Sequence, residues 1–386
     1  MMKTQILLYL TGISMFSLLL SCKSTGKESP AGINNRFNQY ILFVGTYTSG
    51  SGTSKSEGIY VYRVDLDSMK FERLHAIKAS NPSYLCLSPD KKLLFSVNEN
   101  SPGQVSAFRI DSAYMLTFIN AVPSQGSYPC YISVEPTEKY ALVANYGTGS
   151  FAMLGINADG SLTPALSVIQ DKGKGPNTTR QEGPHAHMIT PNPFNGKIYA
   201  TDLGTDRVHI FAIDTLHKQL MSATTSYSTI PGAGPRHLAI YPNGQWMYIL
   251  SELTGTIEVA HIDPHQGNLE RIQTISTLDS SETRYPGSAD IHITPNGKYL
   301  YASNRGDINN IACFVIDPQS GLLSLKGHIP SGGRTPRNFC LDPSGRYLLV
   351  AKQDSNNIIV FTIQNDGMLK AVHTFNVPMP VCLKFL

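Results

Sequence analysis

One short sequence pattern occurs seven times along this chain of 386 residues. Each copy starts with Gly, Asp or Asn, continues with alternating apolar residues and closes on Asp or Asn. The copies begin at Gly58, Gly103, Gly149, Asp206, Gly255, Asn309 and Asn356. Successive copies lie roughly 45 to 55 residues apart, the period of a four-stranded propeller blade. Because one such unit buries its apolar face only against its neighbours, the repeat predicts an all-β protein, a seven-bladed β-propeller.

A second repeat precedes six of these copies and predicts a β-hairpin. It contains an alternating strand, a turn with Pro and often Asn-Gly or Ser-Gly, and a second apolar strand. Its copies start at Asn81, Tyr128, Gly183, Gly234, Gly287 and Thr335. The outermost strands are expected to begin at Phe71, Leu116, Leu162, Leu220, Leu269, Leu323 and Leu369. Each blade is therefore predicted to hold four antiparallel strands, which we name A to D from the centre outward.

The seventh hairpin is divided between the two ends of the propeller. Pro380–Leu386 has the pattern of an A strand, and Tyr40–Thr48 has that of the B strand which should follow it. Their pairing would close the ring within one blade and leave no sheet edge exposed. The sequence thus predicts one propeller domain over residues 40–386, which we expect to be a monomer.

The first 21 residues have the features of a lipoprotein signal peptide. Lys3 precedes an apolar run from Ile6 to Leu20 that is too short for a stable membrane span. Leu-Leu-Ser-Cys at residues 19–22 resembles the bacterial lipoprotein box, in which the Cys becomes lipid-modified; an ordinary signal peptide is the alternative. Residues 22–39 are expected to form a flexible tether. We therefore expect an exported protein held at the bacterial cell envelope only by a lipid anchor at Cys22.

Composition narrows the classes of ligand. A formal net charge of +3 with 15% charged residues gives no footprint for nucleic-acid binding. The other cysteines form no C-x-x-C pair and have no His at zinc spacing: Cys86, Cys130, Cys313, Cys340 and Cys382. We expect most of them to be small buried side chains, with disulfides as the alternative. No metal site and no cofactor are predicted, because neither a ligand cluster nor a phosphate-binding Gly loop is visible.

Topology predicts which polar residues gather at one rim. The start of each A strand and the end of each B strand lie on the same rim, so their side chains converge at the mouth of the central channel. Four consecutive blades bring an unusual polar mixture there: His185 and His187, then Arg236, His237 and Glu252, then Asp290, His292 and Arg305, and finally Arg337. This mixture predicts a functional site at the rim.

These motifs resemble those of the seven-bladed lactonase family, which includes bacterial 6-phosphogluconolactonase and fungal carboxymuconate-cyclising enzymes. The resemblance covers residues from about 40 to 386. It rests on Gly-Pro-His-Ala-His at 183–187, Gly-Pro-Arg-His at 234–237 with Ser-Glu at 251–252, the segment 289–305, and Phe-Val-Gly-Thr-Tyr-Thr at 43–48. What it implies is a catalytic rim made of His185, Arg236, Glu252 and Arg305.

Lactone hydrolysis needs a base that activates water and positive groups that stabilise the developing oxyanion. We expect a 6-phosphogluconolactonase-like hydrolase that opens 6-phosphogluconolactone or a related aldonolactone. Either Glu252 or His185 is the base in this hypothesis. Arg236 contacts the oxyanion or an anionic group, and Arg305 binds the anionic group of the sugar lactone. Supporting candidates for substrate binding are His187, His237, Asp290 and Arg337.

Two other functions fit the same residues. The arginine pair would equally suit a muconate-type lactone cyclase or isomerase, and an exported propeller can also be a non-catalytic ligand-binding protein. Export itself argues for a sugar lactone outside the cytoplasm. Arg236 and Glu252 alone would also suit a structural ion pair, and His292 is expected to be packed. In the long connection from Thr163 to Gly183, we expect Lys172, Lys174 and Arg180 to be solvated charges, with coverage of a bound anionic substrate as the alternative.

Overall fold

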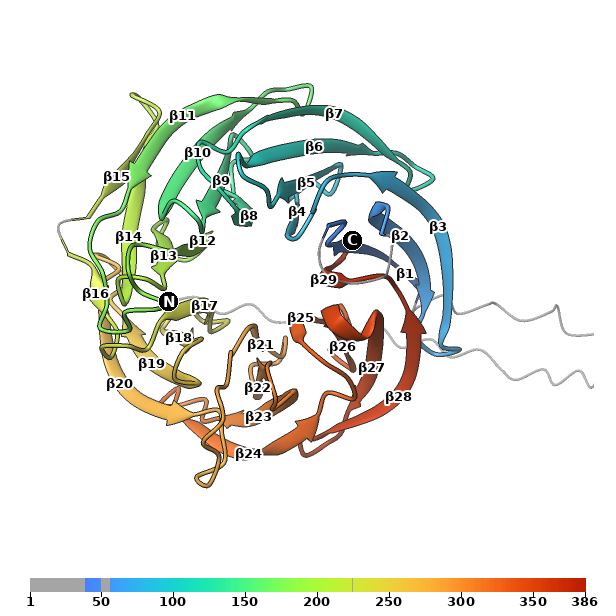
Figure 1. The fold of residues 1–386 in the computed structure, drawn as a ribbon, viewed down its shortest axis with the longest axis vertical. Helices are drawn as coiled ribbons and strands as arrows, with labels where there is room; N and C mark the ends of the chain where they lie inside the picture. The colour runs from blue at the N-terminus through green and yellow to red at the C-terminus, as the bar shows by residue number, and fades with distance from the viewer. Residues whose placement is uncertain (1–38, 50–55, 224) are drawn as a thin grey trace, which may run out of the picture. The chain divides into compact units, whose positions relative to one another are not determined.

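The computed structural model describes residues 39–49, 56–223 and 225–386. The predicted signal peptide at 1–21, Cys22 and all of the predicted tether except Gln39 lie outside these residues. Seven separate antiparallel sheets are arranged in a ring around a central channel (Figure 1). The prediction of an all-β, seven-bladed propeller is therefore confirmed. Within the part of the chain that is described, no helix has the length and apolar character needed to cross a bilayer.

The first three blades use the N-terminal half of the domain and the last strand of the chain. From the channel outward, the first contains β29 (Pro380–Phe385), β1 (Gln39–Thr46), β2 (Gly58–Asp65) and β3 (Lys70–Lys78). The second contains β4 (Leu85–Leu87), β5 (Leu93–Asn98), β6 (Gln104–Ile110) and β7 (Leu116–Pro123). The third contains β8 (Pro129–Val134), β9 (Tyr140–Asn145), β10 (Ser150–Ile156) and β11 (Leu162–Gln170).

The other four blades follow in chain order. The fourth contains β12 (Ala186–Pro191), β13 (Ile198–Asp202), β14 (Arg207–Asp214) and β15 (Gln219–Ser222), with β16 (Tyr227–Ser228) as an extra partner of β14. The fifth contains β17 (Pro235–Ile240), β18 (Trp246–Ser251), β19 (Thr256–Ile262) and β20 (Leu269–Ser276). The sixth contains β21 (Ile291–Ile293), β22 (Tyr299–Asn304), β23 (Asn310–Ile316) and β24 (Leu323–Pro330). The seventh contains β25 (Pro336–Leu341), β26 (Tyr347–Lys352), β27 (Asn357–Ile363) and β28 (Leu369–Asn376), with a short 3₁₀ turn at Gln353–Ser355.

The position of a strand within its blade explains its sequence pattern. Second strands such as β9 and β18 lie between neighbouring blades, and all of their residues are buried. Fourth strands such as β11 lie at the outside of the ring, and their side chains alternate between more and less exposed. A strand covered on both faces reads as a continuous apolar run, whereas a strand with one solvated face alternates.

The two ends of the propeller pair as the sequence predicts. β29 lies antiparallel to β1, with Leu42 opposite Phe385 and Gly45 opposite Cys382 (Figure 1). Leu42, Val44 and Leu383 are buried where the two strands meet. The ring is therefore closed by hydrogen bonds between segments about as far apart in the chain as possible.

One detail differs from the sequence-based expectation. β11 extends to Gln170, so the irregular connection in this blade runs from 171 to 185 and does not begin at Thr163. The A strands β4 and β21 have three residues each, at the short end of what the repeat predicts. The five described cysteines are all free, and Cys130, Cys313 and Cys382 are buried, while Cys86 and Cys340 are half-buried. Burial is thus the outcome for most of them, and none of the five forms a disulfide.

Candidate active site

A single buried carboxylate lies at the centre of the predicted site. Glu252 directly follows β18, and its Oε2 accepts hydrogen bonds from Nε of Arg236 at 2.9 Å and lies 2.9 Å from Nη2 of Arg305. Its Oε1 lies 2.7 Å from Nη2 of Arg180. Three guanidinium groups therefore converge on one carboxylate. Arg236 is buried, and it also donates to the backbone oxygen of Ala289.

This arrangement leaves a surplus of positive charge. Burial raises the pKa of Glu252, but Arg305, Arg236 and Arg180 outweigh that effect and hold the pKa far below its usual range. Burial, together with Arg305 and Arg337, lowers the pKa of Arg236 to about 10, so that this group is still charged at neutral pH. One negative charge thus faces three positive charges in a poorly solvated place, which favours an incoming anion or a developing oxyanion.

The expectation that Arg180 is a solvated charge is wrong, because its guanidinium contacts Glu252; the alternative, a place in the anion site, fits this contact. The turn before Arg180 is fixed by Asn177, whose Oδ1 accepts from the backbone N–H groups of Thr179 and Arg180. The side chain of Gln181 is buried and donates to the backbone oxygen of Leu203 at 2.8 Å and to Asp206 at 2.7 Å. These contacts attach the loop 171–185 to the fourth blade, which lets the Arg180 side chain reach Glu252 in the fifth.

His185 is held at the edge of this cluster. Its Nδ1 lies 3.1 Å from the backbone oxygen of Tyr146, and its ring stacks on the Tyr146 ring with 4.6 Å between centroids. The Tyr146 hydroxyl in turn accepts from Arg180 at 3.3 Å. Because a carbonyl oxygen only accepts, Nδ1 of His185 carries the hydrogen and a neutral ring has its lone pair on Nε2. That Nε2 lies 3.2 Å from Oε1 of the exposed Glu182.

Two further candidates, His237 and Asp290, lie buried beside Arg236. His237 contacts Arg236 through Nε2 at 3.3 Å and Asp290 through Nδ1 at 2.8 Å. Asp290 also contacts His292 at 3.1 Å, but the His292 side chain is one-third exposed (33%), so it is not the packed histidine that was expected. Burial, with the charge of Arg236, lowers the pKa of His237 to about 4, against the effect of Asp290. His237 thus contacts Arg236 directly, and Asp290 holds His237 in place.

His187 is on β12, two residues after His185, and is buried. Its ring is edge-on to His237 at 5.3 Å and to Tyr146 at 5.7 Å. Burial, followed by the charges of Arg236 and His237, lowers the pKa of His187 well below its ordinary value. Its Nδ1 is buried and has no hydrogen-bond partner among the described residues. His187 is therefore neutral and lines the channel just beneath the cluster.

Arg337 lies across the channel mouth from Glu252. Its guanidinium is 3.6 Å from Oε2 of Glu99 and 5.4 Å from the centre of the Tyr47 ring. Arg337, Arg236 and His187 line a cavity of about 10 Å³, which is about the size of one water molecule. Tyr47 and Glu99 also line a larger pocket of about 430 Å³, which is within the range of small-molecule sites. Arg337 thus lies between the large pocket and the buried arginine cluster.

Several residues of the site were not among the sequence candidates. Tyr146 and Glu99 directly follow β9 and β5, so the rule that selected Glu252 and Arg305 also covers their positions. The Tyr285 hydroxyl accepts from Arg180 at 2.7 Å and donates to Glu252 at 3.3 Å, and Tyr285 lies in a connection between blades. Nothing in the local sequence marks Arg180 or Tyr285, because both belong to irregular segments whose path depends on distant contacts.

Comparison with known proteins identifies the family. Residues 41–385 match the family model described as lactonase, 7-bladed beta-propeller. The chain belongs to this lactonase family. It is 33% identical over 353 residues to the 6-phosphogluconolactonase of Bacillus subtilis, covering 90% of this chain and 99% of that protein.

Solved structures of other lactonase-family members are also similar. A candidate 6-phosphogluconolactonase from Bacteroides fragilis has a TM-score of 0.85 at 37% identity and covers 92% of this chain and 100% of its own. The periplasmic gluconolactonase of Pseudomonas aeruginosa has a TM-score of 0.84 at 33% identity, with 90% and 99% covered. The similarity therefore extends over nearly the whole propeller.

Proposed function

We propose that this protein is a lactone hydrolase that opens a sugar lactone at the arginine cluster. The observation that carries the proposal is the convergence of Arg180, Arg236 and Arg305 on Glu252, beside His185, whose Nε2 contacts the exposed Glu182. Ester hydrolysis needs these two elements, a base and a preorganised positive site for the oxyanion. The assignment as 6-phosphogluconolactonase in Bacillus subtilis supports a sugar lactone as the substrate.

His185 is the better general base of the two that the sequence offered. Both oxygens of Glu252 are already held by guanidinium groups, and its depressed pKa makes it a poor proton acceptor. His185 is half-buried, with Nε2 directed toward Glu182. In this mechanism Nε2 takes a proton from water, and the resulting hydroxide attacks the lactone carbonyl carbon. The imidazolium then returns the proton to the ring oxygen as the C–O bond breaks, and Glu182 stabilises the charged ring.

Glu252 has a positioning role in this scheme. It fixes three guanidinium groups in one place, where they stabilise the oxyanion and an anionic group of the substrate. Planar guanidinium groups bind carboxylate and phosphate in a bidentate manner. We assign Arg236 to the oxyanion side and Arg305 to the anionic group. Arg337 contacts Tyr47 and Glu99, which line the 430 Å³ pocket from which such a substrate would approach.

The test is lactone hydrolysis by the purified protein after subtraction of spontaneous opening. The two substrates are 6-phosphogluconolactone and unphosphorylated gluconolactone, and their ratio of kcat/KM reports whether a phosphate is recognised. Glu252→Gln should lower kcat by at least about tenfold, because the guanidinium groups lose the charge that orders them. Glu270→Gln, on the exposed face of β20, is the matched control and should hydrolyse lactone at the wild-type rate.

Two results would count against the proposal. Wild-type protein that opens neither lactone faster than buffer is not a hydrolase of these substrates. Glu252→Gln with unchanged kcat and altered binding only would instead indicate a ligand-binding propeller. A folded state of both variants is checked by circular dichroism, so that loss of activity is not mistaken for unfolding.

We also propose that the protein is exported and anchored through Cys22. The Leu-Leu-Ser-Cys motif at 19–22 supports this location, as does the similarity to a periplasmic gluconolactonase. The substrate would then be a sugar lactone of the cell envelope or the surroundings. In cell fractionation, wild-type protein should appear with the membranes, and Cys22→Ser should move it to the soluble fraction. An unchanged distribution would argue against lipidation at Cys22.

A further inference from the structure

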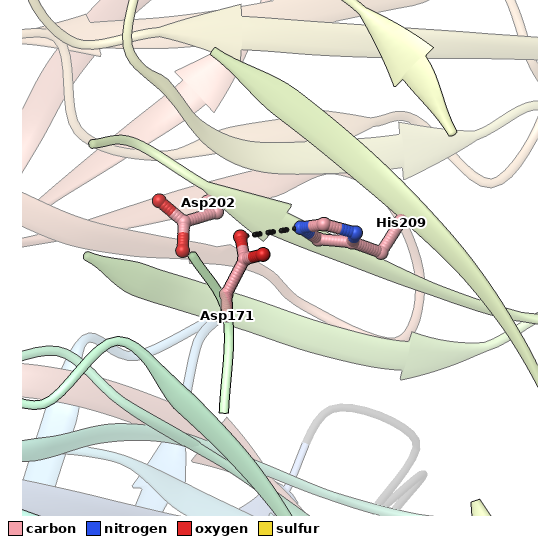
Figure 2. Close-up of side chains that lie close together, drawn as sticks. All are labelled: Asp171, Asp202 and His209. Carbon is pink, nitrogen blue, oxygen red and sulfur yellow. Dashed lines mark hydrogen bonds and ion pairs between the residues drawn. The ribbon is translucent and has the colours of Figure 1, made fainter. Parts of the chain in front are cut away.

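Three polar side chains from separate segments lie close together in the fourth blade. Asp171 begins the loop 171–185, Asp202 ends β13, and His209 lies on β14. One ligand-type atom of each lies within 4.8 Å of the other two, and Figure 2 shows the three side chains turned toward one another. Nε2 of His209 is 2.7 Å from Oδ2 of Asp171. The cluster is not part of the arginine site.

One carboxylate oxygen of Asp202 is buried without a hydrogen-bond donor in the described part of the chain. Its Oδ1 accepts from the backbone N–H groups of His185 at 2.9 Å and Thr205 at 3.0 Å. Its Oδ2 is buried and has no hydrogen-bond partner among the described residues. A buried carboxylate oxygen without a donor is costly, and a second carboxylate nearby adds to the cost. A cation beside this oxygen would remove that cost.

We propose that Asp171, Asp202 and His209 bind a divalent transition-metal cation. Two ligand atoms on one cation lie no more than about 4.4 Å apart, since each is about 2.0–2.2 Å from the metal. The upper limit of 4.8 Å on the present separations is close to this value, and Nε2 of His209 and Oδ2 of Asp171, now 2.7 Å apart, would move apart to admit the cation. Two carboxylates with one imidazole favour Zn²⁺ or Mn²⁺ over Ca²⁺, which prefers oxygen ligands alone. The hydroxyl of Thr205, 3.2 Å from Asp171, is available as a further oxygen ligand.

A shared proton is the competing way to satisfy the two carboxylates. A proton between Asp171 and Asp202 would satisfy the buried oxygen of Asp202 but would leave His209 in contact with Asp171 alone. A cation would be bound by all three side chains at once, and imidazole is a common metal ligand.

A cation at this place would stabilise the proposed active site, because two of its ligands are connected to segments of that site. Asp171 starts the loop that carries Arg180 to Glu252, and Asp202 holds the backbone of His185. The loop and the end of β13 would then be tied together by metal–ligand bonds. Cation binding needs no lactone and goes beyond the proposed hydrolysis, so it can be tested separately.

The experiment is calorimetric titration of chelator-treated protein with Zn²⁺, Mn²⁺ and Ca²⁺, together with Tm at each concentration. We expect one equivalent of Zn²⁺ or Mn²⁺ to bind and to raise Tm, with Ca²⁺ binding much more weakly. His209→Gln and Asp202→Asn should each weaken binding by at least about tenfold. His217→Gln is the matched control: His217 pairs with Asp214 at 2.6 Å on the surface, and its loss should leave binding unchanged.

Asp202→Asn also tests the reasoning without metal. The amide keeps one oxygen for the His185 and Thr205 backbone and removes the buried charge, so that the metal-free variant should be at least as heat-stable as metal-free wild type. Only wild type should gain stability from Zn²⁺ or Mn²⁺. Absence of binding at about 100 µM metal, or equal binding by wild type, Asp202→Asn and His209→Gln, would overturn the proposal. Preference for Ca²⁺ over both transition metals would overturn it as well.

Discussion

Glu252 shows how a single residue changes role when its surroundings are known. In the sequence it is an ordinary candidate for a general base at the end of a strand. In the structure both of its oxygens are held by guanidinium groups, which is why we propose His185 as the proton acceptor. The sequence could predict that these residues share a rim, because strand ends follow from the repeat. It could not predict their roles, because those depend on Arg180, which arrives from a different blade.

His185→Asn should lower kcat by about 10²- to 10⁴-fold with little change in KM, because the base is lost while the arginine cluster remains. The Asn amide retains a donor for the backbone oxygen of Tyr146, which keeps the local structure. Steady-state kinetics with gluconolactone measure both constants. His217→Asn on the surface is the control. A raised KM at unchanged kcat would show that His185 binds substrate and is not the base.

Lys352 makes stability depend on pH. It ends β26, is fully buried and has no hydrogen-bond partner among the described residues, and burial lowers its pKa to about 7. Between about pH 7 and 10.5 the unfolded chain binds more protons at this residue than the folded one does, so the free energy of unfolding rises with pH. Lys352→Met should remove this rise and raise stability at pH 7 by on the order of 2 kcal/mol.

Urea unfolding of wild type and Lys352→Met at pH 7 and pH 10 measures both effects. The gain is set below the full ~1.36 kcal/mol per pKa unit, because the shorter Met side chain leaves part of the space of the ammonium group unfilled. A variant that is less stable than wild type at pH 7 would show that the Lys352 ammonium has a stabilising partner.

At the scale of elements, regular strands were predictable and the functional loop was not. The start of β11 at Leu162 follows from its alternating pattern, as do the starts of β20, β24 and β28. The loop 171–185 has no such pattern, and its path is set by close backbone contacts. Gly204 is one of them, since a Cβ atom there would lie 1.9 Å from the backbone oxygen of Gly183. Only glycine allows the turn after β13 to touch the segment that leads into His185.

Gly204→Ala should therefore displace the segment before His185 and reduce kcat/KM, with an overpacking cost of about 1–3 kcal/mol in stability. Gly183→Ala tests the other side of the same contact. A Cβ atom at Gly183 meets no atom within 4 Å, so this variant should resemble wild type. Thermal unfolding and lactone kinetics compare the two. Equal behaviour of the two variants would mean that the contact does not position the loop.

For the whole molecule, closure of the ring is the feature that sequence repeats predicted most fully. Seven third strands and six complete hairpins leave one hairpin to be made from the two ends, and β29 pairs with β1 accordingly. The number of blades follows from counting the repeats, and the ring is expected to close because an unpaired sheet edge is unfavourable. No sequence motif marks the Asp171, Asp202 and His209 cluster, because the spacing and the types of these residues match none of the usual metal-binding motifs.

Deletion of residues 380–386 should open the ring and strongly lower stability. It removes β29 and exposes the edge of β1 with the buried side chains of Leu42 and Val44. We expect a large drop in Tm and association of the shortened protein, seen by circular dichroism and size-exclusion chromatography. Insertion of two glycines after Asp366, in the turn between β27 and β28, should be tolerated. A monomeric shortened protein with wild-type Tm would contradict closure by β29.

The central claim, that the arginine cluster of this propeller hydrolyses sugar lactones, is tested most directly by the rate of acid release from gluconolactone and 6-phosphogluconolactone in a pH-stat. Wild type should release acid well above the spontaneous rate with at least one of the two, and Arg236→Ala should fall to the spontaneous rate while it stays folded. If wild type does not accelerate either reaction, or if Arg236→Ala is as active as wild type, the claim is contradicted.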